Sequence, residues 1–203
     1  SVFCNAHISH RVEHRNTVIN IESAVVECLG IGNLGAENIR IFSFYFSEGD
    51  SYEEYRDEVI RRVKAMTDYA ISEGLICCHE NEKGIYGDNA ERCLDILKAC
   101  EGKLKAVFDP ANFVQCGVDT LKAYDLLEDY IEYFHIKDAL YENSDVVPAG
   151  EGDGNVEEIL KRFDKHKKAV ILSLEPHLKV FAGLDKLEND DDKSVVGKFV
   201  YNS

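Results

Sequence analysis

Four side chains able to bind a metal ion stand at the ends of four apolar segments. They are Glu80 after LICCH, Asp109 after AVF, His135 after YF and Glu175 after ILSL. About one strand–helix unit separates each from the next, so in a parallel α/β barrel all four would reach the same carboxyl-terminal mouth of the sheet. The spacing therefore predicts one metal cage made by these four residues.

Three carboxylates and one imidazole form an oxygen-rich ligand set. Such a set favours Mn²⁺, Mg²⁺ or Co²⁺, with Zn²⁺ a further possibility, over the thiolate-rich cage of structural zinc. A divalent ion with open positions polarises a carbonyl, while a nearby carboxylate moves a carbon-bound proton. These are the physical requirements for isomerising or epimerising a sugar beside its carbonyl through an enediolate.

Two of the three prolines follow Asp109 and Glu175 directly. Proline disfavours the helical conformation of the residue before it, so both carboxylates are expected to be extended at their strand ends. Taken singly, Asp-Pro and Glu-Pro are better explained as plain strand terminators. The matched positions of Glu80 and His135 favour the metal cage instead.

Short apolar segments alternate with helical patterns along the chain. Near-continuously apolar segments suit a parallel sheet buried on both faces. No G-x-G-x-x-G motif follows a strand, which counts against an open dinucleotide-binding sheet. The predicted fold is α/β, a TIM-type (β/α) barrel that is incomplete, with about six of eight βα units. The predicted strands are Val2–Cys4, Ile39–Phe44, Leu75–Cys78, Leu104–Phe108, Ile131–Ile136 and Ala169–Leu174.

Helices are predicted from apolar spacing and from capping signals. Residues 52–73 place apolar side chains on one helical face, and residues 119–128 follow the same period. Asp88 with Glu91, and Asn155 with Glu158, have the spacing of capping boxes, so helices are expected to begin near 89 and 156. Because capping explains these polar side chains, they are not site candidates.

Composition limits the partners and the setting. A formal net charge of −15 disfavours nucleic acid and anionic membrane surfaces, because most of the protein surface would repel them. Seven cysteines without a C-x-x-C pair fit a reduced, cytoplasmic setting. A single barrel domain over residues 1–203 is expected, truncated at the amino terminus and at the carboxyl terminus. Its open strand edges favour a homo-oligomer.

Six ordered segments carry a resemblance to a known family. The sequence resembles the sugar phosphate isomerases and epimerases of the xylose isomerase-like TIM barrel superfamily over roughly residues 38–201. This family includes several substrates and reactions. The segments are IRIFSFY (39–45), HENEKGIYGD (79–88), FDPANFVQCG (108–117), EYFHIKDALYE (132–142), VVPAGEGDG (146–154) and LSLEPHL (172–178).

The resemblance implies one divalent ion and a small-molecule sugar or sugar phosphate as substrate. It also implies that Glu80 and Glu175 are catalytic residues, placed to exchange protons with the substrate. Asn112 stands where a histidine contacts sugar in related ketose 3-epimerases, which counts against 3-epimerase activity. The ligands implied for the ion are Glu80, Asp109, His135 and Glu175.

Lys137 lies two residues after His135 and therefore points to the same side of its strand. It is a catalytic or substrate-binding candidate that would hold a phosphate or hydroxyl group, or stabilise an enediolate. The alternative is structural pairing with Asp138 or Glu80. The GEGDG loop at 150–154 is either a cover over the mouth or a plain turn. Further substrate-binding candidates are Lys83, Tyr86, Asn112 and His177, although Lys83 and Tyr86 also fit a solvated loop.

Two other functions are open from the sequence. A metal-dependent hydrolase of the endonuclease IV type shares the barrel and the metal-bound carboxylates, but it requires more histidines and a DNA-binding surface. A catalytically inactive metal-binding fragment is the second alternative, because the absent barrel units normally carry part of the substrate pocket.

Overall fold

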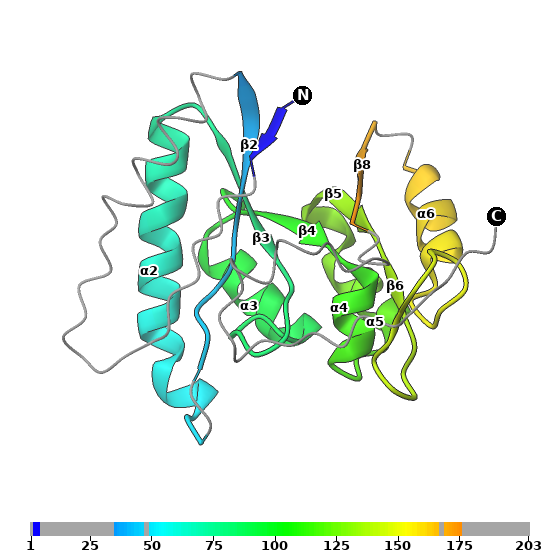
Figure 1. Ribbon diagram of the computed structural model, residues 1–203. Helices are drawn as coiled ribbons and strands as arrows, with labels where there is room; N and C mark the ends of the chain where they lie inside the picture. The colour runs from blue at the N-terminus through cyan, green and yellow to red at the C-terminus, as the bar shows by residue number, and fades with distance from the viewer. Residues whose placement is uncertain (1, 5–34, 47–48, 167–168, 176–203) are drawn as a thin grey trace, which may run out of the picture.

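Six parallel strands form the main sheet of the computed structural model, which describes residues 2–4, 35–46, 49–166 and 169–175 (Figure 1). The hydrogen-bonded order follows the chain, and the sheet forms a half-barrel. The six parallel strands predicted from the sequence are thus confirmed, although β2 begins and ends three residues earlier than expected. The strands are β1 (Val2–Cys4), β2 (Ala36–Ile41), β3 (Ile76–Glu80), β4 (Lys105–Phe108), β5 (Ile131–Ile136) and β8 (Ile171–Leu174).

Helices follow most of the strands, in the alternation that makes parallel connections possible. Four of them match the predicted segments to within a residue or two. The fifth, α4, was not predicted because it is short and follows strand β4 immediately. The helices are α2 (Tyr52–Ser72), α3 (Ala90–Ala99), α4 (Pro110–Gln115), α5 (Thr120–Leu127) and α6 (Val156–Asp164), with a 3-10 turn at Glu128–Tyr130. None of the described helices is long and apolar enough to cross a membrane.

Both predicted capping boxes are wrong. Asn89, not Asp88, caps α3 by accepting a hydrogen bond from the Arg92 backbone N–H at 2.9 Å. The Asp88 carboxylate instead pairs with the Arg92 guanidinium. Asn155 precedes α6 with a left-handed backbone at φ 55°, and its side chain makes no capping bond. Its amide donates to Thr120 Oγ1 at 2.9 Å, so a tertiary contact takes the group that local spacing assigned to the cap.

The two faces of the sheet pack differently because successive strand residues point to opposite sides. One face, which we call the helix face, belongs to a large apolar cluster shared with α2, α3, α5 and α6. The opposite face, which we call the site face, has a much smaller apolar cluster and most of the buried charges. The site face carries Arg40 from β2, Cys78 and Glu80 from β3, Val107 from β4, and Tyr133 and His135 from β5.

A second, two-stranded sheet follows β5 in the chain. The short strands β6 (Asp138–Ala139) and β7 (Val146–Val147) form an antiparallel pair that the sequence did not predict.

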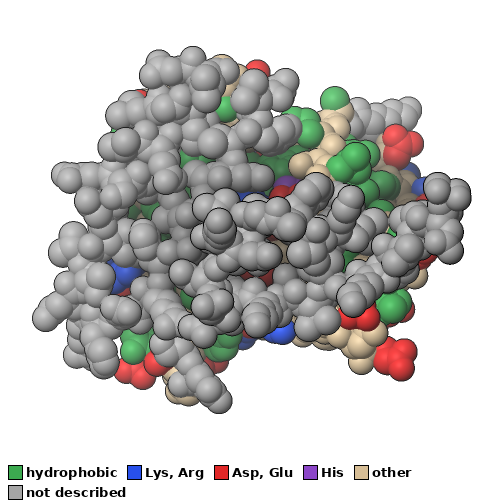
Figure 2. Space-filling model, viewed as in Figure 1, with side chains coloured by type: hydrophobic (Ala, Val, Ile, Leu, Met, Phe, Trp, Pro, Cys, Tyr) green, Lys and Arg blue, Asp and Glu red, His purple; other side chains and the backbone are tan. Residues whose placement is uncertain are grey.

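Hydrophobic side chains gather over the β8 side of the face drawn in Figure 2. Leu172 and Leu174 of β8 are exposed by 48% and 76%. Among the described strands β8 is an edge, since only β5 pairs with it.

Candidate metal centre

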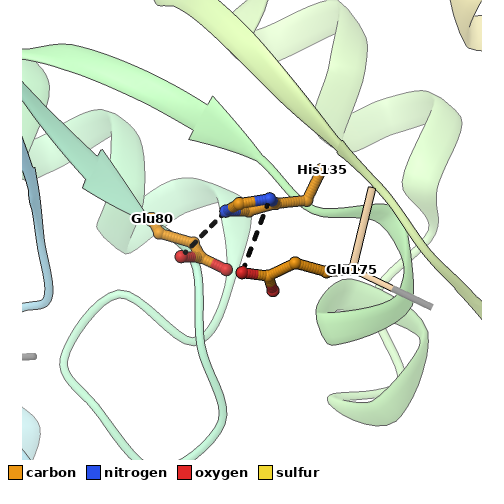
Figure 3. Close-up of side chains that lie close together, drawn as sticks. All are labelled: Glu80, His135 and Glu175. Carbon is orange, nitrogen blue, oxygen red and sulfur yellow. Dashed lines mark ion pairs between the residues drawn. The ribbon is translucent and has the colours of Figure 1, made fainter. Parts of the chain in front are cut away.

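Three of the four predicted ligands converge at the carboxyl ends of β3, β5 and β8. The candidate ligand atoms of Glu80, His135 and Glu175 all lie within 4.8 Å of one another (Figure 3). Glu80 Oε2 is 3.4 Å from His135 Nε2, and Glu175 Oε1 is 3.8 Å from His135 Nδ1. Glu80 and His135 are buried, whereas the Glu175 side chain keeps 19% of its surface exposed.

The strand register explains this convergence. Glu80 pairs with Val107 of β4, and His135 pairs with Ser173 of β8. Because the strands are parallel and neighbours in register, their last residues lie at one edge of the sheet. Glu175 follows β8 directly and donates its backbone N–H to the carbonyl of Ile136 at 3.4 Å, which extends the β5–β8 pairing by one step.

Asp109 lies beside this group rather than inside it. It caps α4, because its Oδ1 accepts a hydrogen bond from the Asn112 backbone N–H at 3.0 Å. Its backbone is extended, at φ −110° and ψ 106°, as expected for a residue before proline. Asp109 Oδ2 is turned toward Lys137 Nζ at 3.4 Å. The metal cage predicted from the sequence is therefore split into a three-residue group and an adjacent Asp109–Lys137 pair.

Two buried atoms at the site have no hydrogen-bond partner among the described residues. They are Asp109 Oδ2 and His135 Nδ1. Leaving a buried polar atom unsatisfied costs about 1–3 kcal/mol, so such atoms are usually occupied by a ligand, an ion or water. Both can donate a lone pair to a cation. The His135 ring nitrogen and the carboxylates of Glu80 and Glu175 form a donor set that fits a divalent ion such as Mn²⁺ or Mg²⁺, and the Asp109 carboxylate lies beside this set.

Burial and charge act against each other throughout the site. Burial raises the pKa of Asp109 although Lys137 opposes the shift, and burial raises the pKa of Glu82 to about 7. Burial by itself lowers the pKa of Lys137, but Asp109 and Glu82 raise it above the ordinary value. For His135, burial is likewise outweighed by Glu80, and the net pKa is raised. The carboxylates of the site thus favour the protonated forms of Lys137 and His135.

Arg40 lies at the candidate site and was not predicted from the sequence. Its guanidinium is buried, and Nη1 donates a short hydrogen bond to Glu80 Oε2. The same nitrogen lies 3.4 Å from His135 Nε2 and 3.5 Å from Glu175 Oε1. The sequence did contain a signal, because the arginine between Ile39 and Ile41 is the only charged residue in the predicted strand Ile39–Phe44. Such a charge is rarely buried without a partner.

Lys137 and Asn112 border the three-residue group. Lys137 Nζ donates to Asn112 Oδ1 at 2.7 Å. The Asn112 amide donates to Glu80 Oε1 at 3.3 Å and to Glu82 Oε2 at 3.2 Å. The structural pairing considered for Lys137, with Asp138 or Glu80, is not what the structure shows, since its closest partners are Asn112 and Asp109.

Two of the other substrate-binding candidates, Lys83 and Tyr86, lie in the loop after β3. Lys83 is exposed in the loop after β3. Tyr86 is buried on the helix side, where its hydroxyl donates to Asp95 Oδ2 at 2.9 Å. His177 lies outside the described residues.

The GEGDG loop closes around Asp138 instead of forming a plain turn. The Asp138 carboxylate accepts hydrogen bonds from the backbone N–H groups of Gly150, Gly152 and Gly154 at 2.8–3.1 Å. A Cβ atom at Gly152 would lie only 2.6 Å from the Ala139 carbonyl oxygen. Glycine is therefore required where the loop backbone approaches Asp138, the residue next to Lys137.

The fold agrees with a comparison against protein-family models. The family described as xylose isomerase-like TIM barrel matches residues 25–190. The chain belongs to this family. A search of curated proteins found no match to the sequence. Several solved structures, in contrast, share the fold.

Three of these structures illustrate the similarity. The probable 3-DHS dehydratase AsbF of petrobactin synthesis from Bacillus anthracis has a TM-score of 0.66 and 17% identity, covering 86% of this chain and 68% of that one. A D-tagatose 3-epimerase-like protein has a TM-score of 0.66 and 20% identity, covering 75% and 60%. A xylose isomerase-like TIM barrel protein from Mycobacterium smegmatis in complex with magnesium has a TM-score of 0.60 and 16% identity, covering 77% and 60%. The chain thus spans about 60% of the length of the last two of these proteins.

Proposed function

We propose that this chain carries the site of a metal-dependent isomerase or epimerase that acts on a sugar or sugar phosphate. The observation that carries the proposal is the convergence of two glutamates and one histidine, each from a different strand end. A divalent ion bound by Glu80, His135 and Glu175, with Asp109 adjacent, would polarise a substrate carbonyl. The similar barrels, one in complex with magnesium and one 3-epimerase-like, support the same class of chemistry.

The two glutamates differ in access, which suggests different roles. Glu175 retains 19% exposure, whereas Glu80 is held from two sides, by Arg40 and by the Asn112 amide. A general base must reach the proton that it removes. We therefore assign proton removal from the carbon beside the carbonyl to Glu175. Glu80, once protonated from solvent, would return a proton to the neighbouring carbon or to the opposite face, and Glu175 would release its proton to solvent.

Lys137 and Asn112 would position the substrate. An ammonium group has three N–H donors. Asn112 accepts one of those of Lys137 at 2.7 Å, and Asp109 Oδ2 lies within ion-pair distance at 3.4 Å. The remaining donor is suited to a hydroxyl or phosphate oxygen of the substrate. Such a contact fixes the sugar so that its reacting carbon faces the glutamates.

The proposed partner is a small molecule rather than nucleic acid or a membrane. The net charge of −15 supports this, because a polyanion would be repelled. The described part of the site offers one histidine to the candidate metal, which does not favour the multi-zinc hydrolase. We also propose that the chain works in a reduced, cytoplasmic setting and that it self-associates through the edge strand β8.

Replacing Glu175→Gln tests the function. Glutamine keeps the size and one oxygen ligand but removes the basic carboxylate, so turnover should fall by about two orders of magnitude or more. Affinity for Mn²⁺ should weaken only modestly. The measurement is deuterium incorporation from D₂O into the carbon-bound positions of free and phosphorylated ketohexoses and ketopentoses, followed by NMR at saturating Mn²⁺.

The matched control is Glu157→Gln on the exposed side of α6, where the carboxylate pairs with Lys161. This variant should exchange deuterium like the wild type. If Glu175→Gln also exchanges at the wild-type rate, Glu175 is a ligand only. If the wild-type chain binds Mn²⁺ and exchanges deuterium into none of these sugars, the inactive metal-binding alternative is correct.

A further inference from the structure

One nitrogen atom of Arg40 contacts all three candidate ligands. Arg40 Nη1 bonds to Glu80 Oε2 and lies 3.4 Å from His135 Nε2 and 3.5 Å from Glu175 Oε1. The oxygens of Glu80 and Glu175 named here also face the His135 ring, as the dashed lines in Figure 3 show. The guanidinium therefore lies among the very side chains that would bind a metal ion.

Arg40 reaches this point for a reason built into the sheet. It is on the site face of β2, because its neighbours Ile39 and Ile41 belong to the helix-face cluster. It pairs with Cys78 of β3, two residues before Glu80. Its Cζ lies 4.8 Å from the centre of the Phe42 ring, a cation–π contact with the residue that directly follows its strand. The side chain is thus directed along the site face toward the carboxyl ends of the strands.

A divalent ion and this guanidinium cannot share the position. Ligand oxygens and nitrogens lie about 2.0–2.6 Å from a bound Mg²⁺, Mn²⁺ or Ca²⁺. Because Arg40 Nη1 lies within 3.5 Å of all three candidate ligands, an ion bound to them would lie next to the guanidinium. Like charges so close, among largely buried side chains, repel strongly. Lys137 does not compete in this way, because Asp109 and Asn112 hold it to one side.

We infer that Arg40 is the internal counter-ion of the metal-free cage, which a divalent ion must displace on binding, so that Arg40 sets the metal affinity of the site. The inference rests on the proposed metal site. In the metal-free state Arg40 compensates the charges of Glu80 and Glu175, which otherwise would repel each other inside a buried site. The ion and Arg40 then stabilise the same carboxylates in alternative states of the protein.

The opposite role for Arg40 makes a different prediction. If Arg40 stays beside Glu80 and merely orients its carboxylate, removal of the guanidinium would weaken metal binding. If Arg40 competes with the ion, its removal destabilises the metal-free state and tightens metal binding. Thermodynamic linkage requires these two effects to accompany each other.

The experiment is calorimetric titration of Mn²⁺ into the chelator-treated full chain, comparing wild type with Arg40→Met. Methionine keeps an aliphatic side chain without the charge. We expect at least about tenfold tighter binding in Arg40→Met, within the usual range of coupling between two sites. Its metal-free melting temperature should be lower than that of wild type, and saturating Mn²⁺ should raise it more.

The control is Arg62→Met on α2, which removes a buried arginine that pairs with Glu58 at 2.6 Å. This variant should lose stability without a change in Mn²⁺ affinity. Equal or weaker binding in Arg40→Met overturns the inference and leaves the proposed function intact. Absence of Mn²⁺ binding in both wild type and Arg40→Met overturns both proposals.

A measurement on the wild type covers the case in which Arg40→Met does not fold. The Nε–H signal of Arg40 in a ¹H–¹⁵N spectrum, assigned with Arg40→Lys, reports the position of the guanidinium. Saturating Mg²⁺, which is diamagnetic, should shift this signal and speed its exchange with water. An Arg40 signal that is unchanged while the His135 ring signals shift would overturn the inference.

Discussion

The ion pair between Lys137 and Asp109 should be one of the strongest pairwise interactions in this protein. Asp109 is fully buried and Lys137 is 8% exposed. Their Nζ and Oδ2 atoms are 3.4 Å apart. At an effective dielectric constant of about 20, two unit charges at this distance attract each other by roughly 5 kcal/mol. Removing both from water costs several kcal/mol, so the net value of the pair is smaller than this attraction.

Removing one partner of this ion pair should lower the free energy of unfolding more than removing both partners together. Lys137→Met should lower the free energy of unfolding by about 3 kcal/mol, because it leaves the Asp109 charge buried without compensation. Asp109→Asn keeps Oδ1 as the cap of α4 and removes only the charge. We expect the double variant to lose about 2–3 kcal/mol less than the sum of the single losses.

The assay is urea unfolding at pH 7.5 with EDTA, applied to wild type, both single variants and the double variant. Lys103 and Asp68 provide the control, since their atoms lie 2.7 Å apart but their side chains are 55% and 57% exposed. A cycle of Lys103→Met and Asp68→Asn should give a coupling below about 1 kcal/mol. If the buried pair couples no more strongly than this surface pair, our electrostatic account of the site is wrong.

Two further predictions concern buried His79 and the loop around Asp138. Burial lowers the pKa of His79 to about 4, whereas the unfolded chain titrates near 6.5, so the metal-free protein should lose up to about 3 kcal/mol of stability as the pH falls from 6.5 to 4. Urea unfolding across this pH range should show a flatter profile for His79→Gln. Gly152→Ala should cost about 2–3 kcal/mol, because its Cβ would lie 2.6 Å from a backbone oxygen. Gly102→Ala, with φ +80° and open space around it, should cost only about 1 kcal/mol by thermal unfolding; equal losses would exclude the steric explanation.

The elements were largely predictable because their signals are local. Segments such as AVILSL are apolar on both strand faces, and the alternation with amphipathic helices specifies parallel connections. The prediction was wrong where a polar side chain had two possible partners. Asn155 had the spacing of a cap, but it donates to Thr120 of another helix, 35 residues away in sequence. Local spacing carries no information about such contacts.

For the candidate site, too, local signals could be predicted from the sequence and tertiary contacts could not. The sequence by itself determined which ligand types stand at the strand ends, since strand alternation and βα spacing are short-range rules that place Glu80 and His135 on one face. Only the tertiary structure decided that Asp109 turns to Lys137 and that Arg40 enters from β2 between the ligands. The physical reason is that each buried charge must find its partner across strands. The register of the sheet and the shared cost of desolvation decide which partner that is.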